Sequence, residues 1–126
     1  MLGVLFWLEL KHLIVDFFQQ TPYHYKNKGT YGHPGGLEHA FQHAFATMLI
    51  LSMGTAISSW GVFWLGVLEF LLHYHIDYFK QNITKDKGWS KLLESKLEVY
   101  SDQYFNVIGV DQFLHQLTYI LLLCAV

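Results

Sequence analysis

The sequence has few charged residues, no arginine and one cysteine, and each scarcity excludes a class of protein. Charged residues fill 14% of the 126 positions, against about 25% in an ordinary soluble domain. The net charge is −2 with neutral histidines, which predicts no nucleic-acid partner because such binding needs a basic surface. Cys124 has no second cysteine with which to form a disulfide, and its leucine-rich surroundings predict an inert thiol.

Apolar residues, in contrast, make up 52% of the chain and gather in long stretches. Each stretch is near the length of about 20 residues that a membrane-spanning helix needs. We therefore predict one domain, residues 1–126, with an all-α fold: a four-helix transmembrane bundle of two helical hairpins. The alternative is a soluble bundle with a very apolar surface, but Leu117–Val126 has no polar face. The predicted spans are about 2–20, 39–59, 60–80 and 109–126.

The connections between these spans differ in lysine content. Lys26 and Lys28 lie in the first connection, residues 21–38, where Pro22, Pro34 and several glycines predict no helix. Four more lysines lie in the third connection, and the middle one has none. Lysine-rich loops favour the cytoplasmic side. This predicts a multi-pass protein of the cytoplasmic (inner) membrane, surrounded by membrane lipids, with both termini outside.

The third connection, about 81–108, has apolar residues at helical spacing with charged residues between them. This pattern predicts a short amphipathic helix at the membrane surface. A helix that packs on the end of the bundle fits the pattern equally well.

The most informative pattern is a repeated spacing of metal-ligand residues. Four times, two such residues stand four positions apart inside or beside an apolar stretch, which places each pair on one helix face. In an up-and-down bundle all four pairs would share one depth, near the lysine-rich loops. The pairs are His12–Asp16, His39–His43, His73–Asp77 and Asp111–His115.

The first and third stretches also resemble one another. Residues 12–20 and 73–81 share a His, an Asp, a Phe and a Gln at matching positions. Two hairpins related by an internal duplication would produce this pattern.

Five imidazoles and three carboxylates at one depth predict a metal centre, with two divalent ions as the expected content. A network of His–Asp hydrogen bonds is the structural alternative, since it would also satisfy buried polar groups. The mixed nitrogen and oxygen ligands suit zinc, iron or manganese. The high share of histidine favours zinc or a hydrolytic dinuclear site.

Other polar residues are candidates for supporting roles. Glu9 and Glu69 lie about one turn from the paired histidines and are candidate catalytic residues: a general base, additional ligands or partners that orient the imidazoles. Lys26, Lys28 and Lys80 are candidate substrate-binding residues for a phosphate group, although ordinary loop lysines would have the same positions. His75 falls on the opposite helix face from His73, and His24 and His33 are expected at the surface. Possible outer hydrogen-bond donors are Gln42, Gln112 and Gln116.

Several motifs resemble a known family. The run Lys11-His12-Leu13-Ile14-Val15-Asp16-Phe17, followed by Asn27-Lys28-Gly29 and by the remaining pairs in order, resembles a small phage and bacterial membrane-protein family catalogued as a domain of unknown function (number 3307). The resemblance covers nearly the whole chain and implies a four-helix membrane protein without an established activity. A more distant likeness, limited to the motifs, is to bacterial membrane-bound metal-dependent hydrolases.

Together these patterns predict a metal-dependent hydrolase that acts on a lipid-linked phosphoester or pyrophosphate. A metal-binding or metal-transport protein without catalysis is the alternative, although the other halves of the spans lack the polar path that transport requires. A haem bundle with two axial histidines would leave the aspartates unexplained. Assembly into an oligomer stays open at this level.

Overall fold

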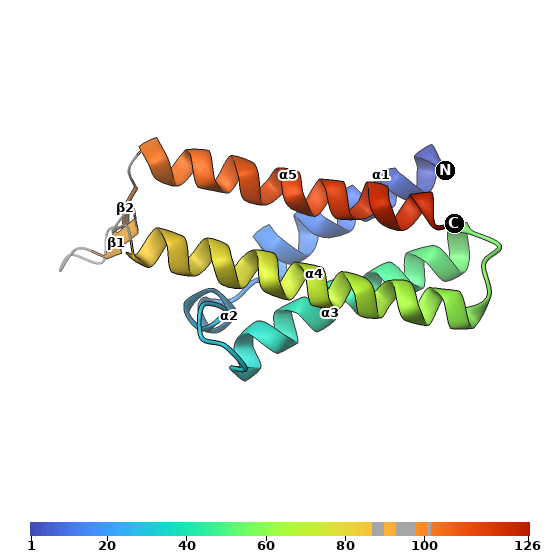
Figure 1. Cartoon of the computed structure of the whole chain (residues 1–126), viewed down its shortest axis with the longest axis horizontal. Coiled ribbons are helices and arrows are strands. Elements are labelled where there is room, and N and C mark those ends of the chain that lie inside the picture. Colours follow the sequence, from blue (N-terminus) through green and yellow to red (C-terminus); the bar gives the residue numbers. More distant parts are fainter. Residues whose placement is uncertain (87–89, 93–97, 101) are drawn as a thin grey trace.

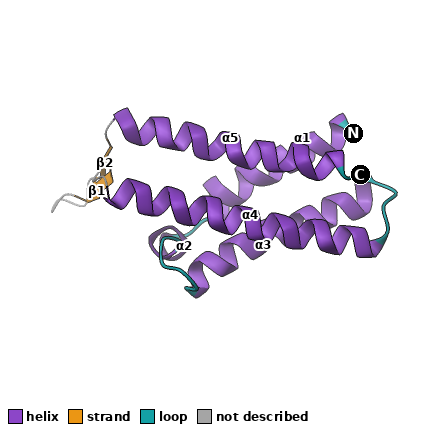
Figure 2. Ribbon diagram, in the orientation of Figure 1, coloured by secondary structure: helices purple, strands orange, loops and turns teal. Residues whose placement is uncertain are grey.

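The computed structural model describes residues 1–86, 90–92, 98–100 and 102–126. Nearly all of this part of the chain is helical (Figure 2). In chain order the elements are α1 (Leu2–Ile14), the π-helical turn η1 (Val15–Gln19), α2 (Pro22–Asn27), α3 (Pro34–Gly54), α4 (Ser59–Asp86), β1 (Ser90–Leu92), β2 (Glu98–Tyr100) and α5 (Asp102–Cys124).

Four long helices pack around one another in a closed ring. Helix α1 contacts α3, α3 contacts α4, α4 contacts α5, and α5 returns to α1. Figure 1 shows α4 and α5 running together along the long axis of the molecule, with both chain termini at the end opposite β1 and β2. The predicted all-α architecture is therefore present. The two predicted hairpins are unequal, because α1 has 13 residues and α4 has 28; the internal duplication stays a prediction.

The predicted membrane architecture is wrong. Within the described residues only α5 is both long and apolar enough to cross a membrane, so neither a four-span transmembrane bundle nor a multi-pass inner-membrane location is supported. Helix α1 ends after 13 residues. Helices α3 and α4 bury polar side chains such as His39, Thr47 and Glu69, and these residues lower the mean hydropathy of helices that looked like spans.

The apolar core lies beside the polar centre. Leu8, Leu51 and Leu122 are completely buried, and Val4, Val62 and Tyr119 complete the cluster. These residues come from α1, α3, α4 and α5, so the core joins all four long helices. It provides the rigid framework on which the polar side chains described below are held.

The first connection contains a helix that the sequence analysis did not predict. Thr21 and His24 form a reciprocal cap at the start of α2, and Pro22 stands at the first turn, where its missing N–H costs nothing. Pro34 starts α3 in the same way, with Gly35 N donating to His33 Nδ1 at 3.0 Å. The prolines were interpreted as helix breakers, but here they begin helices.

The third connection also differs from its prediction. Helix α4 continues to Asp86, and β1 pairs antiparallel with β2 in the register Ser90↔Tyr100, Lys91↔Val99 and Leu92↔Glu98. The described residues of this connection therefore form the end of α4, a short ladder and the start of α5, where a separate amphipathic helix was expected. Part of that expected helix, at residues 87–89, 93–97 and 101, lies outside the described residues.

Candidate metal centre

All eight residues of the four sequence pairs come together in the structure. They form three groups in which the ligand atoms lie within 4.8 Å of one another, and each group could hold a metal ion. Seven of the eight side chains are buried and Asp16 is nearly so. The groups are Asp16–His39–His43–His73, His12–His73–His115 and Asp77–Asp111–His115.

Two carboxylates organise the imidazoles. Asp16 Oδ1 lies 3.0 Å from Nε2 of both His39 and His43. Asp77 Oδ2 lies 3.4 Å from Nε2 of both His39 and His73. His39 therefore stands between the two aspartates and links the part of the centre on η1 with the part on α4.

Many of these contacts are close without being good hydrogen bonds, and this matters for metal binding. The Nε2 atoms of His39, His73 and His115, together with Asp77 Oδ2 and Asp111 Oδ1, are buried without a hydrogen-bond partner among the described residues. An unsatisfied buried polar atom typically costs about 1–3 kcal/mol. Imidazole nitrogen and carboxylate oxygen are ligands of zinc, iron and manganese. A bound ion would satisfy these atoms, so the donor set fits a metal.

The histidines are held in the form that binds metal. Burial lowers the pKa of His43 and His73 well below the ordinary histidine value, and neighbouring imidazoles lower both further. Burial also lowers the pKa of His12. A histidine with a lowered pKa is neutral at physiological pH, and only the neutral imidazole has a free lone pair for a metal ion.

The two central aspartates are held ionised. Burial alone would raise the pKa of Asp16 and Asp77, but neighbouring groups outweigh it and the pKa of both is lowered. For Asp16 those groups are chiefly His39 and His43. For Asp77 the main one is Lys28, whose ammonium donates to Asp77 Oδ1 at 2.9 Å.

Lys28 is therefore not a free loop lysine. Its side chain is buried, and the charges of Asp77 and Asp16 outweigh that burial and raise its pKa. Because Lys28 occupies Oδ1 of Asp77, Oδ2 remains for an ion. Lys26, the other lysine of this connection, is exposed and belongs to none of the three groups.

His12 belongs to a metal-ligand group and is also held in place by contacts with neighbouring side chains. Its Nδ1 is hydrogen-bonded to Tyr119 Oη at 2.9 Å, and its Nε2 lies 3.1 Å from Gln112 Oε1. The same Nε2 is 3.2 Å from Asp16 Oδ2. His12 thus orients Asp16, whose Oδ1 faces His39 and His43. Gln112 was a predicted partner, but Tyr119 was missed because an aromatic residue in an apolar stretch resembles ordinary core.

A buried ion pair borders the centre, and one of its members was missed. Lys11 Nζ pairs with Glu69 Oε1, and it lies 3.3 Å from His43 Nδ1. Burial lowers the pKa of Lys11, while the nearby Glu69 opposes the change. A useful signal was available: one lysine and one glutamate in two separate apolar stretches have no better partner than each other.

The two glutamates predicted as catalytic therefore lie in different surroundings. Glu69 is completely buried and pairs with Lys11, which lies beside His43. Glu9 is half-buried, and this burial raises its pKa. Neither belongs to a metal-ligand group.

The remaining histidines lie outside the centre. His33 caps α3, and His75 is hydrogen-bonded to Leu71 O at 2.7 Å and faces Tyr31. His24 was expected at the surface, but it is buried in the cap of α2 with Glu38 Oε2 at 3.6 Å. No metal-ligand group within the described residues includes any of the three.

One local feature of the backbone had no sequence signal. Asp16 stands on η1, a π-helical turn that follows α1 directly. Single π-helical turns inserted in helices are frequent at functional sites. Even so, His12 and Asp16 remain close, as the spacing of four residues predicted.

A polar cavity of about 170 Å³ opens beside the centre. Asp16 and Asp111 line it on the side of the metal-ligand groups, and Lys28 and Lys80 also line it. A small anion in this cavity would meet two lysines and the edge of the centre. The cavity adjoins the ligand groups at these two aspartates.

The fold and the site define an all-α protein with a buried cluster of histidine and aspartate side chains that could hold metal ions. The chain belongs to the family described as "Protein of unknown function (DUF3307)", whose model matches residues 4–126. No curated protein and no solved structure matches the chain significantly. The family resemblance noted in the sequence is thus confirmed, whereas neither a membrane nor a hydrolase likeness is shown.

Proposed function

We propose that this protein is a metal-dependent hydrolase of a phosphoester or pyrophosphate with a dinuclear centre. The observation that carries the proposal is that two of the three ligand groups share no residue. One consists of Asp16, His39, His43 and His73, and the other of Asp77, Asp111 and His115. Two ions could therefore be held at once, each by its own set of side chains.

The two groups differ in the number of ligands. The group around Asp16 offers four, which matches the closed coordination of a structural site. The group of Asp77, Asp111 and His115 offers three, as catalytic zinc sites do, where a position stays open for substrate or water. Asp111 also lines the polar cavity, so an open position on this group would face that cavity.

The side chains of this protein would have separate tasks in the reaction. Divalent ions in such a centre polarise a phosphoryl oxygen and make water a better nucleophile. Lys28 keeps Asp77 ionised as a ligand. His12 holds Asp16 in place, and Lys80, on the cavity wall, meets the anionic group as it enters.

The test is reconstitution of activity with metal. Protein stripped with a chelator is reloaded with zinc, manganese or iron, and metal content is measured beside hydrolysis of phosphomonoesters and pyrophosphates. We expect about two ions per chain and turnover that depends on them. The Asp111→Asn variant should lose turnover, whereas Asp102→Asn, an exposed aspartate on the same helix, should not. Full metal occupancy without turnover on any substrate would favour the non-enzymatic metal-binding alternative.

A further inference from the structure

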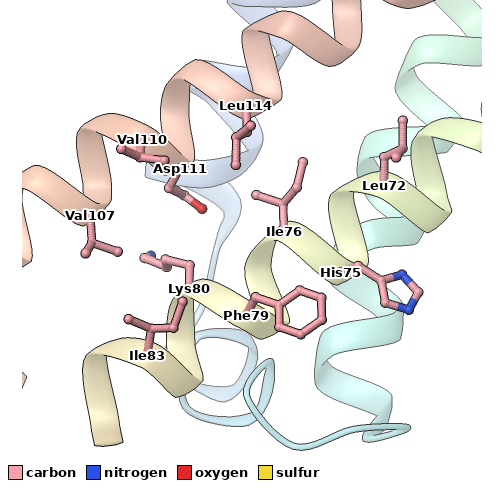
Figure 3. Close-up of a pocket in the computed structure, with 10 residues that line it drawn as sticks. All are labelled: Leu72, His75, Ile76, Phe79, Lys80, Ile83, Val107, Val110, Asp111 and Leu114. Carbon is pink, nitrogen blue, oxygen red and sulfur yellow. The ribbon is translucent and has the colours of Figure 1, made fainter. Parts of the chain in front are cut away.

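A long apolar groove runs between α4 and α5 and has a volume of about 320 Å³. Figure 3 shows side chains of both helices facing the space between them. Several remain substantially exposed although they are large and apolar: Phe79 is 58% exposed, Val110 59% and Leu114 39%. The apolar walls are formed by Ile76, Phe79 and Ile83 of α4 and by Val107, Val110 and Leu114 of α5.

The polar residues that line the groove are His75 on α4 and, beside the metal centre, Lys80 and Asp111. Lys80 and Asp111 line the groove and also the polar cavity. Asp111 is a member of the three-ligand group, and its buried Oδ1 has no hydrogen-bond partner among the described residues. The Lys80 ammonium likewise has no ion pair within the described part of the chain. Figure 3 shows both side chains reaching into the gap between α4 and α5.

We propose that this groove binds the hydrocarbon chain of an amphipathic phosphate monoester, with the phosphate at Lys80 and the three-ligand group. This inference rests on the proposed function and names its substrate class. The walls suit an alkyl chain because they are apolar and would be covered by it. From Lys80 back to Leu72 the groove extends for about 12 Å along α4, a length suited to a chain of several methylenes. The Lys80 ammonium, which has no ion pair among the described residues and lies partway along the groove beside Asp111, suits a phosphate dianion.

The reaction at this position is a balanced hydrolysis. Water and the alkyl phosphate dianion give the alcohol and hydrogenphosphate. The phosphorus–oxygen bond to the chain breaks, a new bond forms from phosphorus to the water oxygen, and one water proton passes to the leaving alkoxide. No oxidant or reductant takes part.

The test separates binding of the chain from catalysis. Binding of dodecyl phosphate, butyl phosphate and the neutral dodecyl maltoside is measured below their micelle concentrations, on metal-loaded and metal-free protein. Each fully buried methylene contributes roughly fourfold in affinity, so dodecyl phosphate should bind at least about tenfold more tightly than butyl phosphate even in an open groove. Lys80→Met should lower the affinity for dodecyl phosphate and leave the affinity for dodecyl maltoside unchanged.

A matched pair of variants locates the chain. Leu114→Trp fills the groove, whereas Leu117→Trp changes a leucine of similar exposure on the same helix that does not line it. Leu114→Trp should remove most of the chain-length dependence of binding and raise KM for dodecyl phosphate. Leu117→Trp should keep the chain-length dependence of binding and the KM of the unaltered protein. Val110→Trp, at a more exposed position, repeats the test if Leu114→Trp does not fold.

The outcomes are distinguishable. The groove proposal is overturned, even if hydrolysis occurs, when dodecyl and butyl phosphate bind equally tightly. It is also overturned when Leu114→Trp and Leu117→Trp lose the same affinity for dodecyl phosphate. A change of oligomeric state in Leu114→Trp alone also overturns it, because the groove would then be an interface between copies. Chain-length-dependent binding that Leu114→Trp removes, but without turnover on any phosphate, supports the groove and contradicts the proposed hydrolysis.

Discussion

At the scale of single residues, charge pairing decides which side chains are available to a ligand. Lys28 occupies one oxygen of Asp77 and Lys11 pairs with Glu69, so two of the buried cations are already neutralised. Lys80 lines the groove and the polar cavity without such a partner in the described structure. Among the lysines first considered for a phosphate group, Lys80 therefore has the surroundings that best suit an incoming anion.

Asp77→Asn tests whether Asp77 is a ligand or only the partner of Lys28. The variant should lose metal and be destabilised by about 3–5 kcal/mol, because it leaves the buried Lys28 charge unpaired. The double variant Asp77→Asn/Lys28→Met should recover stability without recovering metal. Metal content by elemental analysis and urea unfolding measure the two effects. Normal metal content in a folded double variant would exclude Asp77 as a ligand.

Glu69→Gln tests the predicted proton carrier. Glu69 lies outside the ligand groups, so we expect the variant to keep its metal while turnover falls about 100-fold or more. Breaking the pair with Lys11 should also lower stability, so turnover is compared in Lys11→Met/Glu69→Gln, where no buried charge is left unpaired. Glu9→Gln, at a half-buried glutamate outside the ligand groups, is the control and should retain turnover. Metal loss in Glu69→Gln would instead make Glu69 a ligand.

At the scale of elements, a close approach holds the segment that carries Lys28 against α3. A Cβ added at Gly36 would lie 3.2 Å from Lys28 Cα and 3.3 Å from Tyr74 Cε2. Glycine at this position therefore lets the end of α2 pack directly on α3. The position of Lys28, and through it that of Asp77, depends on this contact.

Gly36→Ala should weaken metal binding although it changes no polar group. The added methyl must push the Lys28 backbone away, at a cost of about 1–3 kcal/mol that exceeds the helix-propensity gain of about 1 kcal/mol. Gly109→Ala in α5 is the control, since no atom lies within 4 Å of its added Cβ, and it should be neutral or stabilising. Thermal unfolding and metal titration measure both variants. If Gly36→Ala and Gly109→Ala have the same stability and the same metal affinity, the close contact at Gly36 does not support the metal centre.

At the scale of the whole molecule, the buried ionisable cluster links stability to pH. The lowered pKa values of His43 and His73 mean that the unfolded chain takes up protons below about 6.5 while the folded protein does not. The lowered pKa values of Asp16 and Asp77 add the same effect below the ordinary aspartate value of 3.8. All four groups thus make the folded state less stable as the pH falls.

The metal-free protein should therefore lose stability steadily from about pH 7 to pH 5, by up to about 1.4 kcal/mol per pH unit for each histidine concerned. Urea unfolding at a series of pH values measures this slope. The variant His43→Gln should flatten it, whereas His75→Gln, which alters a histidine outside the centre, should not. A slope unaffected by His43→Gln would mean that His43 does not stay neutral in the folded state.

Metal should stabilise the whole fold, because the ligands come from four long helices and η1. At a free metal concentration 100 times Kd the gain is about 2.7 kcal/mol, or roughly 10 °C in Tm for a chain of this size. Scanning calorimetry with and without added zinc tests this expectation. An unchanged Tm at full occupancy would mean that the ions bind the unfolded chain equally well.

The ligand residues could be predicted from spacing because an α-helix places positions four apart on one face. All eight were named from the sequence, and the structure brings all eight together. Lys11 and Tyr119 could not be found in this way, because their partners Glu69 and His12 are distant in sequence and become neighbours only when helices pack. The π-helical turn at Asp16 and the capped helix α2 likewise depend on local hydrogen bonds that composition does not reveal.

By itself the sequence determined that the chain is helical and that its metal-ligand residues face one interior, since both follow from periodicity. It did not determine the surroundings of the helices, because a polar stripe and an apolar face occur both in membrane spans and in helices packed within a protein. Only the tertiary structure decided which helices are short or polar enough to exclude a four-span arrangement. It alone also divided eight ligands into separate groups, because that division depends on distances of a few ångströms between helices.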